Sequence, residues 1–437
     1  MAFFNFYDTE TTGLEWGYDN ILQFSAIRTD EDFNVVSSVN LRGRPFPWVI
    51  PHPAAMLTTG IGPKQIFAQS MSQYDLVKEI AAHFKANTPA INIGFNSIGY
   101  DELMLRAAFF QTLHPMYITQ RGDNSRADVM LLAQAVAEHD TQALKVNLNG
   151  KGKPCFRLTD LAEANGLSCA NAHDAMGDTT MTIALANFLR EKSPRIYGAM
   201  MNCRNKENAA QTLFEEPYLL HTDRAFKVPT IFCTAVMQIG SDAILADLTI
   251  DPSTYLGADV ATLLKLMTKQ PRAFRVVKLN SFPTLIPTTP DAAGMIEPVM
   301  AAWVQLLKSQ TFRENLAVAL TKRYPDKEPD AYVERRMYNG FPTPDDERRM
   351  ADFHGSEGLA YEVFDSLDLN EIARRLRDDD YAASLRKRLA STEKQPWLTI
   401  SAAKAELVEC RERFKASPPA LFDEIADYLN ALEAEIS

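Results

Sequence analysis

The sequence predicts an α/β fold with a mixed sheet, followed by a β-rich region and then a helical region. Strand-like and helix-like segments alternate up to about residue 192 after an antiparallel start, which is typical of an α/β domain with a mixed sheet. Strand-like runs dominate residues 193–325. From about Pro325 the composition becomes charged and rich in Ala and Leu, with helical spacing. We therefore expect three domains in the 437 residues, at 1–192, 193–325 and 326–437.

The first region begins with a buried strand and continues as a meander. The apolar run at residues 3–7 predicts this strand, and Thr12-Gly13 predicts the turn that ends it. Residues 45–63 are rich in Pro and Gly and are expected to form a loop. Further strands are predicted at 22–28, 33–41 and 90–95, and helices at 72–86, 102–113, 128–138, 158–165 and 174–191.

The two later regions also contain regular elements. Strands are predicted at 230–236, 243–248 and 274–279, with a helix at 259–269. In the C-terminal region, apolar residues at helical spacing predict helices at 344–353, 369–378, 380–390, 400–414 and 419–435. Pro344 and Pro418 mark helix starts.

Composition excludes several classes of protein. The net charge of −11 argues against indiscriminate coating of nucleic acid or anionic membranes, but it permits a local basic track. We expect no signal peptide, because no basic region precedes Asp8, and no membrane span, because no apolar run approaches about 18 residues. The five cysteines are widely spaced, which argues against a disulfide framework or a zinc site and favours a reducing cytoplasmic location.

A pair of carboxylates lies at the end of the first strand. Asp8 and Glu10 are two residues apart, so their side chains point to the same face of a strand. Two such acids repel each other, and a divalent cation between them removes the repulsion, because Mg²⁺ binds oxygen ligands. Taken alone, however, the pair favours a solvated strand end.

Two later stretches supply further groups of the same kind. Asp101 follows a strand end and a Gly-containing turn, where its alternative role is to cap the next helix. The stretch 171–178 supplies His173 and Asp178, and Asp174 is the better candidate for the helix cap. Asp178 falls within the predicted helix, where an acid on the apolar side is unfavourable without a partner.

Four carboxylates and one histidine are the groups needed for two-metal hydrolysis of a phosphodiester. Asp8, Glu10, Asp101 and Asp178 are predicted to bind two Mg²⁺ ions, for which Mn²⁺ is a possible substitute, roughly 4 Å apart around the scissile phosphate. Neutral His173 would take the proton from the attacking water. Since the ordinary histidine pKa is about 6.5, activity is expected to increase as the pH rises through neutrality.

This set of residues resembles the DEDDh exonuclease superfamily, which has a ribonuclease H-like fold. D-x-E at 8–10, N-x-x-x-x-D at 96–101 and H-x-x-x-x-D at 173–178 have the order and spacing of that superfamily. The resemblance to bacterial exonuclease I covers nearly the whole chain, densely over the first 210 residues and sparsely after them, and it implies an SH3-like middle domain and a helical C-terminal domain. The stretches that carry it are 26–30, 33–36, 123–126, 156–158, 164–166, 171–176, 204–206 and 338–341.

The resemblance implies a 3′→5′ exodeoxyribonuclease that degrades single-stranded DNA processively to 5′-mononucleotides, in DNA repair and recombination. It implies that the four carboxylates are metal ligands and that His173 is the general base. Glu10 and Arg157 would also contact the terminal nucleotide. Further DNA contacts are implied for Arg106, Tyr117, Lys206 and Lys278.

Local basic segments agree with this substrate. Residues 143–157 contain four basic residues and no acid around a Gly-rich loop, and residues 272–278 add Arg272, Arg275 and Lys278. For each single lysine the alternative is an ordinary solvated surface. An acidic protein with a local basic groove suits an enzyme that threads single-stranded DNA.

The partner usual for this family is the acidic, Phe-ended tail of single-stranded-DNA-binding protein. Such a tail needs a basic, apolar pocket. Here the loop Pro283–Ala293 contains no Arg or Lys, and Ala199 supplies no aromatic platform. These departures put this interaction in doubt, and the chain is expected to act as a monomer.

Two other functions compete with this interpretation. A DEDDh exoribonuclease that trims RNA 3′ ends needs the same five residues, because the metal chemistry does not depend on the 2′-OH. The long extension after residue 192 favours DNA as the substrate. A non-catalytic nucleic-acid scaffold predicts the loss of one or more of the acids, all of which are present.

Overall fold

A computed structural model describes residues 3–169, 174–222, 230–255, 257–269, 272–289, 297–324, 328–355 and 363–436. The chain forms two compact units, of which the first comprises Met1–Asn124, Cys169–Ile183 and Pro329–Ser437 and the second Ser125–Ser168 and Ala184–Glu328. Helix α7 (Ala175–Lys192) begins in the first unit and ends in the second. No helix of the described segments is long and apolar enough to cross a membrane.

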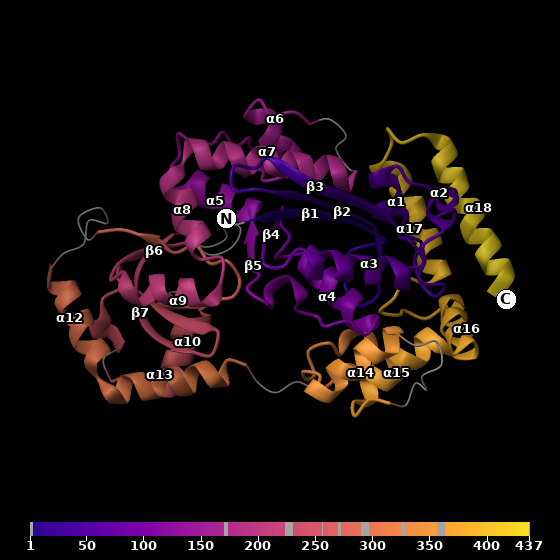
Figure 1. The fold of residues 1–437 in the computed structure, drawn as a ribbon. Helices are drawn as coiled ribbons and strands as arrows, with labels where there is room; N and C mark the ends of the chain where they lie inside the picture. The colour runs from indigo at the N-terminus through magenta and orange to yellow at the C-terminus, as the bar shows by residue number, and fades with distance from the viewer. Residues whose placement is uncertain are drawn as a thin grey trace. The chain divides into compact units, whose positions relative to one another are not determined.

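The first unit combines most of one sheet with helices from both ends of the chain (Figure 1). Its strands are β1 (Phe4–Thr11), β2 (Ile21–Thr29), β3 (Val35–Arg42) and β4 (Ile91–Gly94). Its N-terminal helices are α1 (Pro53–Thr59), α2 (Pro63–Phe67), α3 (Gln73–Ala86), α4 (Asp101–Gln111) and η1 (Ile118–Gln120). Its C-terminal helices are η4 (Val333–Arg335), α14 (Pro344–Gly355), α15 (Leu367–Arg377), α16 (Asp379–Lys387), η5 (Arg388–Ala390), α17 (Ile400–Arg413) and α18 (Pro419–Ile436).

The sheet is mixed, as the sequence predicts. Its order is β3-β2-β1-β4-β5, with β5 at Ser125–Asp128. Strand β1 pairs antiparallel with β2 and parallel with β4, and β2 pairs antiparallel with β3. One face of β1 and β2 packs on α3 and α4 through a buried core that includes Tyr7, Phe24, Phe84 and Phe109. Strand β1 therefore lies inside the sheet, and any side chain that it presents on the other face is held by a rigid support.

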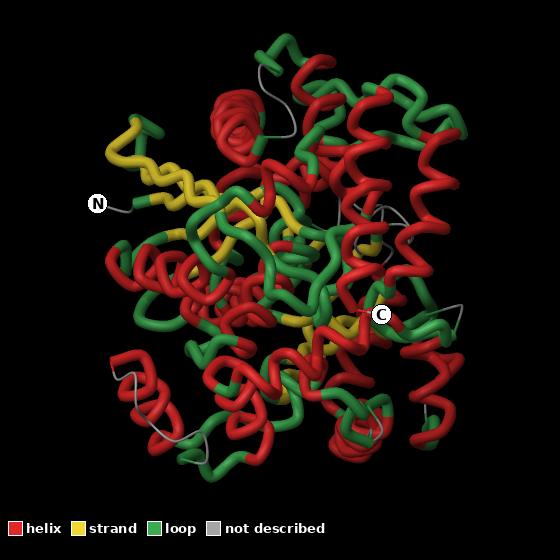
Figure 2. The backbone as a smooth tube through the Cα atoms, turned by 90° about the vertical axis from the view of Figure 1, so that its right-hand side faces the viewer, coloured by secondary structure: helices red, strands yellow, loops and turns green. Residues whose placement is uncertain are grey.

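The C-terminal helices pack onto the N-terminal part of the same unit. Helices α17 and α18, at the right of Figure 1, run side by side and face the viewer in Figure 2. Their core residues, such as Leu407 and Leu429, form one cluster with Met56 of α1 and Ile66 of α2. A second cluster joins Phe353 of α14 to Phe110 of α4. The two ends of the chain thus pack together through two hydrophobic clusters.

The prediction of a loop at residues 45–63 is wrong, because the structure forms α1 and begins α2 there. Pro53 and Pro63 occupy the first helical positions, where a proline loses no hydrogen bond. Gly60 adopts the left-handed conformation (φ 71°) that ends α1. The Pro and Gly residues therefore mark helix ends rather than a continuous loop.

The second unit contains an antiparallel sheet and more helix than the sequence predicts. Its sheet has the order β10-β6-β7-β8-β9. Its strands, besides β5, are β6 (Leu219–His221), β7 (Ile231–Ile239), β8 (Asp242–Asp247), β9 (Phe274–Lys278) and β10 (Ile286–Pro287). Its helices, besides the end of α7, are α5 (Val129–His139), α6 (Leu158–Ala164), α8 (Pro194–Asn202), α9 (Lys206–Glu215), η3 (Pro252–Tyr255), α10 (Val260–Thr268), α12 (Glu297–Lys308) and α13 (Gln310–Lys322). Helices α10, α12 and α13 cover the sheet through Phe274, Trp303 and Leu316, a packing that strand patterns alone did not reveal.

Candidate active site

Strand β1 carries the first two predicted ligands. Asp8 lies opposite Ser25 and Glu10 opposite Gln23 in the antiparallel pairing with β2. Both acids are half-buried, as the same-face prediction requires, and the neighbouring side chain of Thr9 is buried. The strand therefore presents two carboxylates on one face at a fixed spacing.

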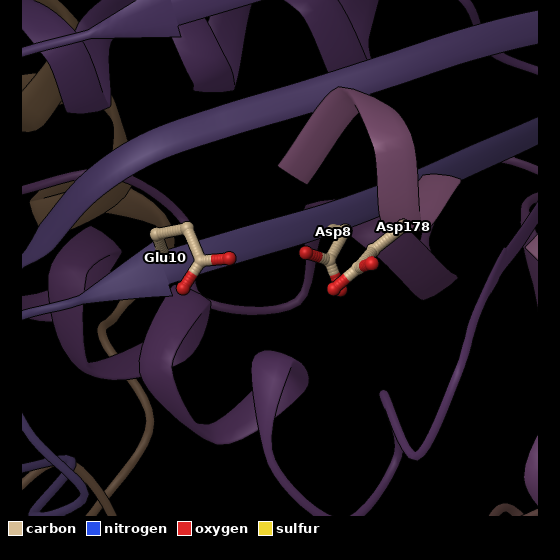
Figure 3. A group of neighbouring side chains, drawn as sticks. All are labelled: Asp8, Glu10 and Asp178. Atoms are coloured by element: carbon tan, nitrogen blue, oxygen red, sulfur yellow. The ribbon is translucent and has the colours of Figure 1, made fainter. Parts of the chain in front are cut away.

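Helix α7 brings the third carboxylate to these two. Ser25 Oγ donates to the carbonyl oxygen of Ala175 at 2.6 Å and lies 2.5 Å from Thr179 Oγ1, which fixes the first turns of α7 on β2. Asp178, the residue before Thr179, then faces Asp8, with Glu10 farther along the strand (Figure 3). Asp8, Glu10 and Asp178 each offer a carboxylate oxygen, and these three oxygens lie within 4.8 Å of one another. Carboxylate oxygens at this separation fit a hard divalent cation such as Mg²⁺.

Asp101 is buried at the first residue of α4. Its carboxylate accepts hydrogen bonds from the Thr9 amide at 3.1 Å and from Thr9 Oγ1 at 2.5 Å. The alternative that Asp101 caps α4 is wrong, because the residue at the cap position is Tyr100. Asp101 is instead held against β1 by Thr9, which lies between Asp8 and Glu10 in the sequence, and the charge of Asp101 acts on both of these acids.

The electrostatics of this cluster favour protons or a cation. Burial, followed by the charges of Asp101, Glu10 and Asp178, raises the pKa of Asp8 well above its ordinary value. Burial, followed by the charges of Asp178 and Asp101, raises the pKa of Glu10 to about 8. Bound cations would offset the repulsion among these carboxylates and favour their ionised forms, since they supply positive charge. The donor atoms and the charge of the site therefore fit divalent metal.

Asp174 has a role beyond capping α7, which is the only role that the sequence predicts for it. As predicted, it accepts from the Met176 amide at the start of α7. Its carboxylate also accepts from Arg42 of β3 at 2.5 Å and from Gln23 of β2 at 3.1 Å. These bonds fix the start of α7 on the sheet, and nothing in the spacing of Arg42 or Gln23 along the sequence indicates this role.

His173, the predicted general base, lies outside the described residues. Its neighbour Asp174 is the first described residue of that segment. The assignment of His173 therefore stays a prediction.

Arg106 and Tyr117, two predicted DNA contacts, lie together in the first unit. The Arg106 guanidinium lies 5.1 Å from the Tyr117 ring centroid and 3.2 Å from Glu102. The Tyr117 ring lies 5.8 Å from the ring of Phe341, whose side chain is 75% exposed. Phe341 thus presents an exposed ring beside Tyr117, whereas the Arg106 side chain is only 14% exposed.

The other three predicted DNA contacts belong to the second unit. Arg157 is exposed and forms an ion pair with Asp160 at 2.5 Å. Lys206 is the first residue of α9, and Lys278 ends β9 with its amino group 5.8 Å from the Tyr324 ring. Their roles stay predictions.

Comparison with known proteins agrees with this site. Residues 6–186, which contain all four carboxylates, match the family described as exonuclease. Exodeoxyribonuclease I of Escherichia coli (strain K12) is 27% identical over 420 residues, which cover 90% of this chain and 88% of that protein.

Solved structures of exonuclease I share the fold. The E. coli enzyme in complex with a dA16 oligonucleotide has a TM-score of 0.83 and 22% identity, covering 99% of this chain and 100% of that one. A structure described as single-stranded-DNA-binding protein with exonuclease I and an inhibitor has a TM-score of 0.82 and 22% identity, covering 99% and 100%. The predicted resemblance and the predicted fold class are confirmed.

Proposed function

We propose that this chain, which carries an exonuclease-family domain and resembles exodeoxyribonuclease I over nearly its whole length, degrades single-stranded DNA from the 3′ end. The products would be 5′-mononucleotides, released processively, and the biological setting DNA repair and recombination. The cluster of Asp8, Glu10 and Asp178 on β1 and α7 carries the proposal, because it has the donors and charge for divalent metal. The similarity to an enzyme solved with a DNA oligonucleotide supports DNA as the substrate.

The proposed mechanism assigns each group a separate task. Asp8, Glu10, Asp101 and Asp178 would hold two Mg²⁺ or Mn²⁺ ions, whose chemistry is to stabilise the attacking and leaving oxygens of the phosphodiester. His173 would accept the proton of the attacking water. Thr9 holds the Asp101 carboxylate, and Arg42 holds Asp174 at the start of α7, so the ligands need little rearrangement.

We propose that the single-stranded DNA leading to the site contacts basic and aromatic side chains. The Arg106–Tyr117 pair and the exposed ring of Phe341 supply a cation and π-faces on which bases stack. Arg157 would bind the terminal nucleotide together with Glu10. Lys206 and Lys278 would bind phosphates, and both lie at ends of regular elements.

The domain and partner assignments are also proposals. We propose domains at 1–192, 193–325 and 326–437 and a monomeric enzyme. Binding of the tail of single-stranded-DNA-binding protein is proposed only by similarity to the solved complex. The absence of Arg and Lys from 283–293 argues against the usual pocket. Titration of the protein with a fluorescent tail peptide would show whether the tail binds.

The test is digestion of 5′-labelled single-stranded DNA beside matched RNA and matched duplex DNA, with Mg²⁺ and with EDTA. We expect Mg²⁺-dependent shortening of the single-stranded DNA from its 3′ end, with RNA and duplex largely spared. Preferential trimming of RNA would replace the proposal by an exoribonuclease. Absence of cleavage of any substrate would reopen the scaffold interpretation.

A matched pair of double variants tests the carboxylate cluster. Asp8→Ala/Asp178→Ala should lose several orders of magnitude in rate, since metal ions supply most of the catalysis in such sites. Glu31→Ala/Asp32→Ala removes the same charge from an exposed turn and should retain wild-type activity. Equal activity of the two variants would refute the metal assignment.

A further inference from the structure

One histidine outside the carboxylate cluster lies between two acids from distant parts of the first unit. His52 Nδ1 is 2.8 Å from Glu406 Oε2 on α17, and His52 Nε2 is 3.8 Å from Asp19 Oδ1 on the loop after β1. The Asp19 side chain is only 4% exposed, whereas that of His52 is 28% exposed. The imidazole therefore joins this buried loop carboxylate to the C-terminal helix α17.

The same glutamate also caps α1. His52 occupies the position before α1 but makes no side-chain cap of its own. The Ala54 amide instead donates to Glu406 Oε1 at 3.0 Å, from a residue 352 positions away in the sequence. Both oxygens of Glu406 are thus used to fasten α17 to the start of α1, and a carboxylate at a helix N-terminus is favourable.

The other side of His52 supports the loop that follows β1. Asp19 accepts from Thr12 Oγ1 and from the Glu15 amide, both at 2.8 Å. The His52 amide donates to the Thr12 carbonyl oxygen at 2.7 Å. A Cβ at Gly13 would lie 2.4 Å from His52 Cδ2, so the loop backbone rests directly on the imidazole ring.

This loop is hydrogen-bonded to residues beside the candidate metal ligands. The Gly13 carbonyl oxygen accepts from Thr11 Oγ1 at 2.8 Å and from the Tyr100 hydroxyl at 2.9 Å. Thr11 directly follows Glu10, and Tyr100 directly precedes Asp101. A displacement of the loop would therefore move the residues next to Glu10 and Asp101, because hydrogen bonds connect them to Gly13.

We propose that the His52 imidazolium is a positioning residue, which holds the loop after β1 against α17 and thereby fixes the carboxylates for hydrolysis. The proposal rests on the proposed exonuclease function. It gives the C-terminal helices a direct mechanical connection to the active site, in addition to any contact that they make with DNA.

The surrounding charges favour the protonated form of His52. Burial lowers the pKa of His52, but the hydrogen bond to Glu406 and the charges of Asp19, Glu406 and Glu15 outweigh it, so the pKa is raised. Conversely, although burial raises the pKa of Glu406, its hydrogen bonds to His52 and Ala54 lower it overall. The charged groups around the imidazole are mostly acidic: Glu15 and Asp19 on the loop, Glu406 and Arg413 on α17, and Glu393 and Lys394 on the preceding segment. His52 also lines a cavity of about 520 Å³ that admits water, so it exchanges protons with solvent.

The direction of the pH effect follows from the sign of the shift. We call the contacts of the His52 imidazolium with Glu406 and Asp19 the clamp. The imidazolium is fully charged below the ordinary histidine pKa of about 6.5, and its charge is lost as the pH rises through the raised pKa of His52. This trend opposes that of a general base such as His173, which gains activity as the pH rises.

The test compares wild type with His52→Gln, which keeps hydrogen-bonding groups but no charge. We would measure kcat/KM on 5′-labelled single-stranded DNA from pH 6 to 9.5 at saturating Mg²⁺. We expect His52→Gln to be about five- to twentyfold slower at pH 6.5, a usual size for coupling between linked sites, and to approach wild type at pH 9. Since Glu406→Gln removes the same contact, the double variant should be no slower than either single variant.

His354→Gln is the matched control. His354 of α14 also joins the C-terminal helices to the N-terminal part, through Tyr74 at 2.6 Å and the Leu113 carbonyl oxygen at 2.9 Å. Burial lowers its pKa, so it is neutral near pH 7, and its replacement should not change the shape of the pH profile.

Profiles of wild type and His52→Gln that stay parallel at all pH values would overturn the proposal, as would additive losses in the double variant. The midpoint of thermal unfolding against pH supplies a second measurement that needs no catalysis. The difference between wild type and His52→Gln should be largest below pH 6.5 and vanish at alkaline pH. If the wild type fails to hydrolyse DNA at any pH, the proposed function fails, while this unfolding difference still tests the clamp.

Discussion

Replacing Asp178 by asparagine should stabilise the metal-free protein while abolishing hydrolysis. Folding raises the pKa of Glu10 from 4.5 to about 8, and Asp178 is the first cause after burial. A carboxyl group whose pKa is raised destabilises the folded state increasingly as the pH rises from its ordinary pKa to the raised one. At pH 7 this corresponds to roughly 3 kcal/mol, at about 1.4 kcal/mol per pKa unit. Removing one of several charges should recover about 1–2 kcal/mol of this cost.

The assay is thermal unfolding of wild type and Asp178→Asn, each with EDTA and with Mg²⁺. For a chain of this length, 1 kcal/mol shifts the midpoint by about 1–2 °C if it unfolds as one unit, so we expect a rise of about 1–4 °C in EDTA. Mg²⁺ should stabilise the wild type, because a ligand that binds only the folded state adds to its stability, and should stabilise the variant less. Asp427→Asn, at an exposed position on α18, is the matched control and should change neither value. A variant that is less stable in EDTA, with an undiminished response to Mg²⁺, would refute the argument that repulsion in this cluster is relieved by metal.

Three further outcomes are expected. Glu334 is 1% exposed and accepts from Arg375 at 2.8 Å and Arg388 at 2.7 Å, so Glu334→Gln should lose about 3 kcal/mol in urea unfolding, because it leaves Arg388 without its carboxylate and Arg375 with Glu371 as its remaining acid. The Mg²⁺ concentration for half-maximal hydrolysis should fall as the pH rises from 6.5 to 8, because protons compete with metal for Glu10, whose pKa is about 8. Phe341→Ala should change stability by less than about 0.5 kcal/mol, but weaken oligonucleotide binding in EDTA by about 1–3 kcal/mol in fluorescence anisotropy.

Each of these outcomes has a control within the chain. The exposed pair Glu433–Lys404 should contribute less than about 1 kcal/mol, so a Glu433→Gln loss equal to that of Glu334→Gln would contradict the burial argument. A Mg²⁺ requirement that does not change with pH would show that Glu10 is ionised throughout this range. Leu367→Ala removes another apolar side chain that is 83% exposed, and oligonucleotide binding weakened equally by both changes would deny Phe341 a specific role.

The sequence by itself predicted many of the regular elements and the candidate metal ligands. Strand β1, helices α3 to α7 and the C-terminal helices follow from periodicity and caps, which act between neighbouring residues. The same local rule places Asp8 and Glu10 on one face of β1. The order of the D-x-E, N-x-x-x-x-D and H-x-x-x-x-D stretches then predicts the remaining groups, of which Asp101 and Asp178 lie in the described structure.

Only the tertiary structure decided features that depend on partners far away in the chain. Helices α1 and α2 are 7 and 5 residues long, too short to be stable alone, and they form because Met56 and Ile66 pack against α17 and α18. Arg42 meets Asp174 across 132 positions, and His52 meets Glu406 across 354. No periodicity or motif encodes such a pair, because the two side chains meet only after folding has brought distant segments together, and their attraction must outweigh the cost of partial removal from water.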